Sequence, residues 1–483
     1  MLLVICLAIA WLVLAMRHAR LAVWLLLIWL PIQGWVQLNV FEDSSATVLI
    51  YEFLILGIYV AFTVAAVKRP ARLGPPPFIK YAVPFFVWTL LLVPKSAAAN
   101  GLLLTLVGVR TYLLPIPLIW IGYRAFESRR ELENLGWLLM LETAVIATIA
   151  VSQLTMLSSV GGGVFEVPLG FGQAGVIRPP GTFSSAGHYG MYLLFTIPFA
   201  MGLLSLTARF WQRAVFGIGL AGGIIGLMAN TQRATMILLV LTIPLMAVLA
   251  RRRQAMTRMA IGLALAVMAL AVGNQFAGQV FQERLSSIGG DVHATMIANP
   301  VARLEDALQT PIWGAGLGVA SPGSGRLVPE TSMAAPRRTR ESIKPAESFM
   351  AALIYDTGLP GLSFFYLLVL ILLKRGVEAV RACRGTDLGT LAAGILVFQL
   401  AIVLQSWAYD PLHYPPSRVL FWLWGGVLCA LPRLARAPAF RSRTQPASAI
   451  PVRQLTRPPI AGLAGRRLVG PVAGRRRAAD GSR

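Results

Sequence analysis

The chain is poor in charge and in cysteine, and each shortage excludes a class of protein. Only 13% of its 483 residues are charged, whereas soluble domains carry about a quarter. Too little polar surface is present to cover a water-soluble globule, so lipid must be the solvent for much of the surface. The three cysteines lie in two apolar runs and one basic loop. No two of them are expected at the same depth and on the same side of the membrane, so we expect neither a disulfide nor a metal site.

The positive charge is large, but it does not indicate a nucleic-acid partner. Lysine and arginine number 43 against 20 acidic residues, for a net charge of +23. They occur in short clusters between long apolar runs, which is typical of the connections of a membrane protein. Membrane lipid is therefore an expected partner, and nucleic acid is not.

Long hydrophobic runs are abundant. Hydrophobic residues make up 56% of the chain, and the mean hydropathy is +0.68. The sequence therefore predicts an all-α, polytopic integral membrane protein with about 12 to 13 transmembrane helices, each of about 20 apolar residues, over residues 1–432. The predicted spans are 1–16, 21–38, 46–67, 80–94, 102–123, 134–156, 189–207, 214–230, 234–250, 259–275, 348–373, 387–408 and 417–432.

Basic residues alternate between connections, which assigns one orientation to the chain. The segments 17–20, 68–80, 124–133, 208–213, 251–258, 374–385 and the tail after 432 hold 31 of the 43 lysines and arginines. The positive-inside rule places these segments, and the C-terminus, in the cytoplasm. The tail over 433–483 is rich in Pro, Ala, Gly and Arg and lacks apolar periodicity. It is predicted to be disordered and to touch anionic lipid.

Two predicted external loops are long, over 157–188 and 276–347. Long loops are uncommon unless they are functional or disordered. Within the second loop, 279–287 and 300–310 have the apolar spacing of a helix, with Val301, Leu304 and Leu308 on one face. We expect short amphipathic helices that lie on the outer membrane surface or cap a cavity.

No motif of a soluble enzyme is present, so the candidate site consists of charged residues outside the topological trend. The sequence has no phosphate loop and no His-Glu-x-x-His. Arg178, Arg233 and Arg303 lie in predicted external segments. Arg233 starts a helix after a very short turn, where a rigidly held guanidinium can grip phosphate oxygens through two hydrogen bonds. The alternative is an arginine that only reaches to the membrane interface.

Arg110 lies inside a predicted span, where a charge is costly. It is therefore expected to face a polar cavity or to pair with a carboxylate, for which Glu52 and Glu142 are candidates. The glycines of Gly314-x-Gly-x-Gly318 follow no predicted strand, so they are no dinucleotide fingerprint. They indicate a tight turn or a close approach of backbones.

Two histidines and two carboxylates complete the candidates. His188 is close in sequence to Arg178 and is a candidate for the same cavity. The alternative for it and for His413 is a solvated or capping residue. Glu347 and Asp356 lie at the start of one span and about two turns into it. A carboxylate near the external boundary acts as a general base, holds an arginine or is a structural partner.

The order of these features resembles the O-antigen ligase and O-antigen or exopolysaccharide polymerase family of bacterial inner-membrane glycan-assembly proteins. The similar segments are Arg178-Pro-Pro-Gly-Thr-Phe, Thr231-Gln-Arg-Ala-Thr, the stretch from Arg303 to Gly318, and Gly358-Leu-Pro-Gly361, within residues 100 to 425. Ligases of the family carry His-Asn eleven residues before the glycine of that last helix. Here this position holds Glu347, which favours a polymerase over a ligase.

The resemblance implies a metal-independent, inverting glycosyltransferase without a cofactor, acting on the periplasmic face. Its donor would be a glycan linked to polyprenyl (undecaprenyl) diphosphate, as in lipopolysaccharide or exopolysaccharide biosynthesis. Charge builds up on the departing diphosphate, and arginines suit its stabilisation. Arg178, Arg233 and Arg303 are therefore expected to contact the diphosphate, with Arg233 and Glu347 as catalytic residues and Glu347 as base or orienting group.

Three other functions remain open. The first is an O-antigen-type ligase that moves glycan to lipid A-core or protein. The second is a lipid-linked glycan flippase or transporter, which needs ionisable groups deep in its spans. The third is a polyprenyl-phosphate-sugar glycosyltransferase, for which Glu42 and Asp43 form an acidic pair. A chain-length regulator or export machinery is an expected partner of a polymerase.

Overall fold

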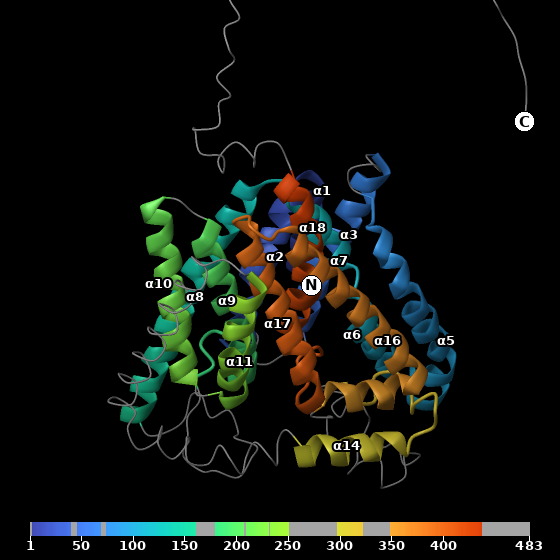
Figure 1. Ribbon diagram of the computed structural model, residues 1–483. Coiled ribbons are helices and arrows are strands. Elements are labelled where there is room, and N and C mark those ends of the chain that lie inside the picture. The colour runs from blue at the N-terminus through green and yellow to red at the C-terminus, as the bar shows by residue number, and fades with distance from the viewer. Residues whose placement is uncertain are drawn as a thin grey trace, which may run out of the picture.

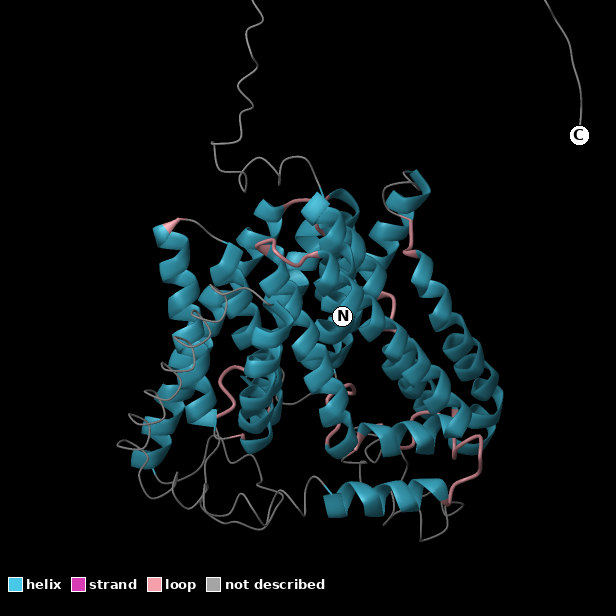
Figure 2. Cartoon of the chain, viewed as in Figure 1, coloured by secondary structure: helices cyan, strands magenta, loops and turns pink. Residues whose placement is uncertain are grey.

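The computed structural model describes residues 2–39, 46–68, 74–160, 179–206, 209–230, 232–250, 297–321 and 348–436. Over these ranges the chain is α-helical with short turns and contains no β-strand (Figures 1 and 2). The all-α class is confirmed.

Within these ranges, ten helical segments are long and apolar enough to cross a membrane, so the protein is a multi-pass membrane protein. The helices are α1 (Leu2–Arg17), α2 (Ala19–Asn39), α3 (Ala46–Lys68), η1 (Pro77–Ala82), α5 (Val83–Asn100), α6 (Leu102–Leu113), α7 (Leu118–Ala125), α8 (Arg129–Val160), α9 (Ala186–Leu206), α10 (Phe210–Asn230), α11 (Arg233–Ala250), α14 (Asn299–Leu308), α16 (Phe349–Ala382), α17 (Leu388–Ala408) and α18 (Pro415–Arg436).

The predicted spans match these helices with few exceptions. The runs over 1–16 and 234–250 are helical, as α1 and α11, but fall below the length of the ten spans. The connection predicted over 17–20 shrinks to His18 between α1 and α2. The predicted helices over 259–275 and 279–287 and most of the tail over 433–483 lie outside the described residues. The amphipathic helix predicted over 300–310 is present as α14.

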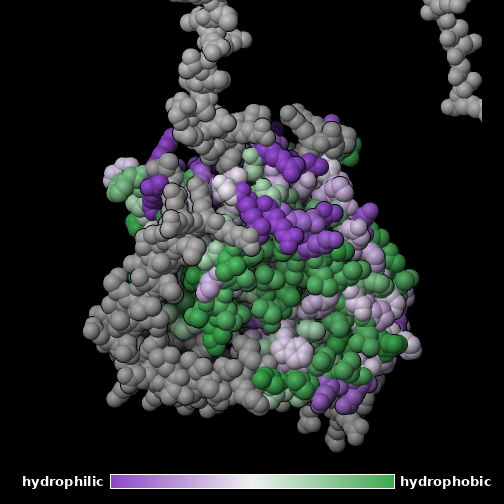
Figure 3. All heavy atoms as spheres, in the orientation of Figure 1, coloured by the Kyte–Doolittle hydropathy of each residue, from purple (hydrophilic) through white to green (hydrophobic). Residues whose placement is uncertain are grey.

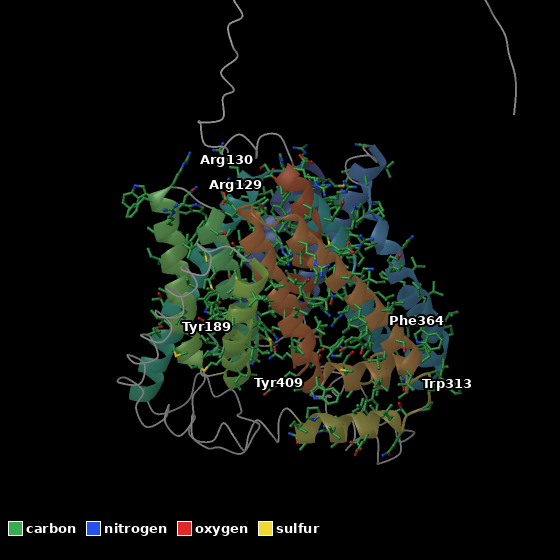
Figure 4. All side chains as sticks on the ribbon, in the orientation of Figure 1. Arg129, Arg130, Tyr189, Trp313, Phe364 and Tyr409 are labelled. Atoms are coloured by element: carbon green, nitrogen blue, oxygen red, sulfur yellow. The ribbon has the colours of Figure 1, made fainter. Side chains whose placement is uncertain are left out.

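The bundle has two distinct ends (Figure 1). One end carries α14 and is called the α14 end; the opposite end is called the basic end. Arg129 and Arg130 lie at the basic end (Figure 4), where Arg129 pairs with Glu133 and Asp387. Figure 3 shows hydrophilic side chains gathered toward this end and a broad hydrophobic area below it. This is the charge distribution that the sequence predicts for one face of a membrane.

Helix α9 is the centre of the domain, because nearly all of its residues are buried. It contacts α8, α10, α11, α17 and α18. Close packing elsewhere depends on glycine, as is usual between membrane helices. A Cβ atom at Gly122 of α7 or Gly426 of α18 would overlap a carbonyl oxygen of the facing helix.

Two predicted spans are broken rather than straight. The run over 102–123 is interrupted between α6 and α7, where Pro115 and Pro117 lack the N–H that a continuous helix requires. The hydroxyl of Tyr59 donates to the carbonyl oxygen of Leu114 at this break, at 2.5 Å. The run over 348–373 extends to Ala382 and bends at Gly358, whose φ of 70° and ψ of −176° are non-helical. The first part of α16 lies across the α14 end, and the rest rises through the bundle (Figure 1).

Candidate functional site

The segment that follows Arg178 is tied to three helices at the α14 end. The side-chain amide of Asn230, the last residue of α10, donates to the carbonyl oxygens of Pro179, at 3.1 Å, and Ala186, at 2.9 Å. Gln153 of α8 exchanges two hydrogen bonds with the backbone of Gly181, at 2.8 and 2.9 Å. Arg178 itself lies outside the described residues, but the residue after it is held against the end of α10.

The start of α11 is packed against the start of α9. A Cβ atom at Gly190 would lie 1.5 Å from Gln232 Oε1, so a larger residue at this position would require the Gln232 side chain to move. Arg233, the first residue of α11, follows Gln232 directly, and its side chain lies outside the described residues. Because Asn230 precedes it by three residues, the backbone positions of Pro179 and Arg233 belong to one local cluster.

His188 in the first turn of α9 links this cluster to the connection between α17 and α18. Its Nδ1 lies 2.9 Å from Ser184 Oγ, and its ring lies 4.2 Å from that of Tyr414. Burial, reinforced by the carboxylate of Asp410, raises the pKa of Tyr414 to about 12. The Tyr414 hydroxyl therefore stays protonated at neutral pH. His188 is half-buried at this junction of helix ends.

The start of α16 meets the same connection. Ser348 caps the helix by accepting a hydrogen bond from Ala351 N, and its hydroxyl donates to the carbonyl oxygen of Ser406 in α17. Phe349 N donates to the carbonyl oxygen of Tyr409 at 3.0 Å. Glu347 lies outside the described residues, yet the residue after it is fixed at the ends of α16 and α17. Tyr189 and Tyr409 mark this level of the bundle in Figure 4.

A buried acid–histidine pair, which the sequence reasoning missed, lies between these elements. His413 Nδ1 lies 2.6 Å from Asp410 Oδ2, and the imidazole packs against the rings of Tyr112 and Phe349. His413 is 5% exposed. Of the solvated or capping roles that the sequence suggests, burial excludes the solvated one, and the contact with Phe349 brings His413 to the start of α16.

Asp356 is fully buried and organises the backbone. Its two carboxylate oxygens accept hydrogen bonds from the backbone N–H of Gly318, the backbone N–H of Ala320 and the hydroxyl of Tyr112, at 3.0, 2.8 and 3.0 Å. Three donors occupy this carboxylate, and none of them is an arginine. Asp356 is thus a structural partner, the last of the three roles that the sequence leaves open.

The glycine cluster forms the tight turn that the sequence predicts. Gly314, Gly316 and Gly318 have φ values of 79°, 122° and 89°, a region that favours glycine. A Cβ atom at Gly318 would meet a carbonyl oxygen of α6 at 2.0 Å. Lys95 donates to the carbonyl oxygen of Gly314 and lies over the ring of Trp313, which is labelled in Figure 4. The turn therefore joins α14 to α5, α6 and α16.

Arg303 is carried by α14 beneath the first part of α16. Ala307 of α14 is fully buried against Ala351 and Ala352. Arg303 is half-buried and interacts electrostatically with Tyr355 of α16. Of the predicted apolar face, Leu304 packs inward, whereas Val301 and Leu308 are exposed. Arg303 thus lies at the α14 end, near Tyr355 in the second turn of α16.

Arg110 forms the ion pair that was one of its two expected roles. Its Nε lies 2.8 Å from Oε1 of Glu52 in α3. Glu142, the other candidate partner, instead accepts a hydrogen bond from the hydroxyl of Tyr192 at 3.2 Å. A further arginine, Arg418 in the first turn of α18, is 2% exposed and interacts electrostatically with both members of the pair. Its signal in the sequence is an arginine just inside the predicted span 417–432.

The structure thus brings Arg233, His188 and the positions next to Arg178 and Glu347 to one junction of helix ends. Arg303 lies below this junction on α14, and Arg110 belongs to a separate cluster with Glu52 and Arg418. Within the described part of the chain, no three His, Cys, Asp or Glu side chains are placed to share a metal ion. Comparison with protein-family models and with curated protein sequences finds no match for this chain.

Proposed function

We propose that the protein polymerises oligosaccharide repeat units linked to polyprenyl diphosphate, by metal-independent, inverting glycosyl transfer at the α14 end. One observation carries the proposal: three distant sequence segments meet at one junction. Hydrogen bonds join Asn230 to Pro179 and Ala186, and ring contacts join His188 to Tyr414 and Phe349 to His413. The chain itself connects Ala186 with His188 in α9 and His413 with Tyr414. The residues expected to act on the substrate are close in sequence to these residues.

The chemistry requires little more than orientation and charge. A sugar hydroxyl of one lipid-linked unit attacks the anomeric carbon of another, and the bond to the diphosphate breaks. The negative charge that appears on the leaving diphosphate is stabilised by Arg178, Arg233 and Arg303. Arg233 is well suited to this role, because it begins a helix, where backbone N–H groups also favour an anion.

Glu347 accepts the proton of the attacking hydroxyl or orients that hydroxyl. The two residues that follow it are held firmly, because Ser348 caps α16 and Phe349 is bonded to the backbone of Tyr409. A base held within a fraction of an ångström keeps the attacking hydroxyl in line with the bond that breaks. The unperturbed pKa of a glutamic acid is about 4.3, so such a base is ionised at neutral pH.

The proposal places the protein in a bacterial inner membrane, with the α14 end in the periplasm and the C-terminus in the cytoplasm. The support is the clustering of basic side chains at the opposite end. Single cysteines introduced at exposed positions at the two ends report this orientation through an impermeant thiol reagent. If the reagent labelled a cysteine at the basic end of the protein in intact, unpermeabilised cells, this orientation would be wrong.

The decisive experiment incubates the purified protein with lipid-linked repeat units and separates the products by size. We expect a ladder that is abolished by Arg233→Ala and strongly reduced by Glu347→Gln, with unchanged folded yield. Arg213→Ala is the matched control, because Arg213 is an exposed arginine in the first turn of α10 at the basic end. A full ladder from Arg233→Ala would overturn the assignment. Transfer of glycan to a new acceptor without a ladder would identify a ligase.

A lipid-linked glycan transporter is a second candidate, and one observation favours it. Glu142 lies within the membrane-spanning part of α8, where its described partner is the hydroxyl of Tyr192. A carboxylate at such depth is typical of transport pathways. Movement of lipid-linked sugar across vesicles that contain the protein, without any polymer, would select this function over the polymerase.

A further inference from the structure

Three charged side chains meet between α3, α6 and α18, away from the junction described above. The ion pair between Arg110 Nε and Glu52 Oε1, at 2.8 Å, joins α6 to α3. Arg418 acts electrostatically on both members of this pair. Two guanidinium groups therefore share one carboxylate within the membrane domain, which leaves one positive charge in excess.

Arg418 is the member that lacks a counter-ion. Its side chain donates to the carbonyl oxygen of Thr111 at 3.2 Å and lies over the ring of Tyr51, 5.7 Å from the ring centroid. Its Nε is buried and has no hydrogen-bond partner among the described residues. In that same part of the chain, no carboxylate lies within 4.0 Å of the guanidinium. A buried cation without a counter-ion costs several kcal/mol, so a site of this kind calls for an anion.

The two buried aspartates among the described residues have other partners. Asp356 accepts from two backbone N–H groups and from Tyr112. Asp410 bonds to the imidazole of His413. Neither is available to neutralise Arg418 without giving up these contacts.

The opening of the cluster faces the bilayer. The Arg110 side chain is 29% exposed, and it shares a helix face with Leu103 and Leu106, which are more than half exposed. On α3, Glu52 is followed by the exposed side chains of Phe53 and Leu56. Large apolar residues that are exposed on membrane helices contact lipid tails. An anion carried by a lipid can therefore reach Arg110 sideways, whereas a free anion would first have to cross an apolar surface.

We propose that Arg110, Glu52 and Arg418 form a binding site for the phosphate or diphosphate head of a membrane lipid. In the absence of lipid, Glu52 neutralises Arg110. When the headgroup arrives it displaces Glu52 from Arg110, and the two guanidinium groups grip the phosphate oxygens together. Glu52 is thus a competitor of the ligand, and its removal strengthens binding. A purely structural ion pair would not behave in this way.

The site also has a place in the proposed reaction, and this part of the inference rests on the proposed function. Polymerisation joins two lipid-linked glycans, so two diphosphate heads must be held in one protein. The junction around Arg233 takes the one that leaves. The site of Arg110 and Arg418 takes the other, which stays attached to its sugar.

Native mass spectrometry of the full chain with farnesyl diphosphate tests the proposal, because it counts bound lipids without any turnover. We expect the doubly substituted R110Q/R418Q protein to bind one molecule of farnesyl diphosphate fewer than the wild type. Each single variant should bind that molecule at least tenfold more weakly. Glu52→Gln is expected to bind it more tightly. Arg375→Gln is the matched control, because its side chain forms an exposed ion pair with Glu378 at the basic end. Arg418→Lys, which keeps the charge and loses the paired donors, replaces Arg418→Gln if the latter folds poorly.

The competing ligands separate the sources of the phosphate. Phosphatidylglycerol that displaces farnesyl diphosphate from the wild type, and not from R110Q/R418Q, would support a lipid site and identify a phospholipid as ligand. If inorganic pyrophosphate bound as tightly as farnesyl diphosphate, the proposal that the ligand is carried by a lipid would be overturned. An unchanged number of bound copies in R110Q/R418Q would overturn the site itself. Absence of a polymer ladder with these binding results intact would overturn only the proposed function.

Discussion

Asp356 offers the sharpest test of how the α14 end is built. Its carboxylate accepts three hydrogen bonds, from the amides of Gly318 and Ala320 and from Tyr112. The substitution Asp356→Asn keeps the shape and replaces one oxygen by a donor. The least costly orientation of the amide places this donor against the N–H of Ala320 and retains the other two bonds.

The expected cost follows from the bonds that are lost. A hydrogen bond to a charged group contributes about 1.5–3 kcal/mol, and a buried N–H without an acceptor costs about 1–3 kcal/mol. Asp356→Asn should therefore destabilise the turn by about 2–3 kcal/mol. Asp356→Ala, which leaves two amides and one hydroxyl without an acceptor, should cost about twice as much.

Hydrogen exchange measures this cost directly at the two amides. A local loss of about 2–3 kcal/mol corresponds to roughly 30- to 150-fold faster exchange in the peptide that contains Gly318 and Ala320. Asp306→Asn is the control, because Asp306 is exposed on α14 and should leave this exchange unchanged. If Asp356→Asn abolished polymer formation while exchange at both amides stayed at the wild-type rate, Asp356 would act in the chemistry and the reasoning would be refuted.

Three further predictions concern other parts of the bundle. Gly358→Ala should lower the free energy of unfolding by about 3 kcal/mol or more, because its φ of 70° and ψ of −176° exclude other residues and a Cβ would lie 2.1 Å from a carbonyl oxygen. Gly217→Ala is the control, because a Cβ there would have open space around it. Equal unfolding midpoints of the two variants in denaturant would contradict the prediction. Gln153→Ala should speed hydrogen exchange at Gly181, because two buried bonds are lost, and unchanged exchange would show that other contacts hold this segment. Burial raises the pKa of Cys383 to about 12, so about one thiol in 10⁴ is ionised at pH 8. Maleimide should therefore label the folded protein very slowly, at a rate that rises about tenfold for each pH unit. Rapid labelling at pH 7 would show that this thiol is not buried.

Much of the architecture could be predicted because the bilayer imposes a simple rule on the sequence. A spanning helix must satisfy its own backbone hydrogen bonds and present apolar side chains over about 20 residues. This rule leaves a local pattern of apolar runs and basic connections. The helices, the basic end and α14 were all readable from it. The bends at Pro115 and Gly358 were less readable, because a span with an interruption has nearly the same hydropathy as a straight one.

The candidate site was only partly accessible in the same way. Arg110 was recognised as a charge at membrane depth, but two carboxylates were possible partners, and only the tertiary structure, which places Glu52 of α3 beside it, selects between them. His413 looked like a solvated end residue because its burial comes from α6 and α16, which are distant in sequence.

The sequence by itself thus determined the class of protein, the positions of most of the described helices, and which charged residues oppose the topological trend. These properties follow from local composition, because each segment crosses or leaves the membrane according to its own apolar and charged residues. The tertiary structure alone decided which charges share a site. It gave Asp356 a structural role, paired Asp410 with His413, and buried Arg418 beside Arg110 and Glu52. Such contacts join residues tens to hundreds of positions apart, and their energies depend on burial and distance, which a linear pattern does not carry.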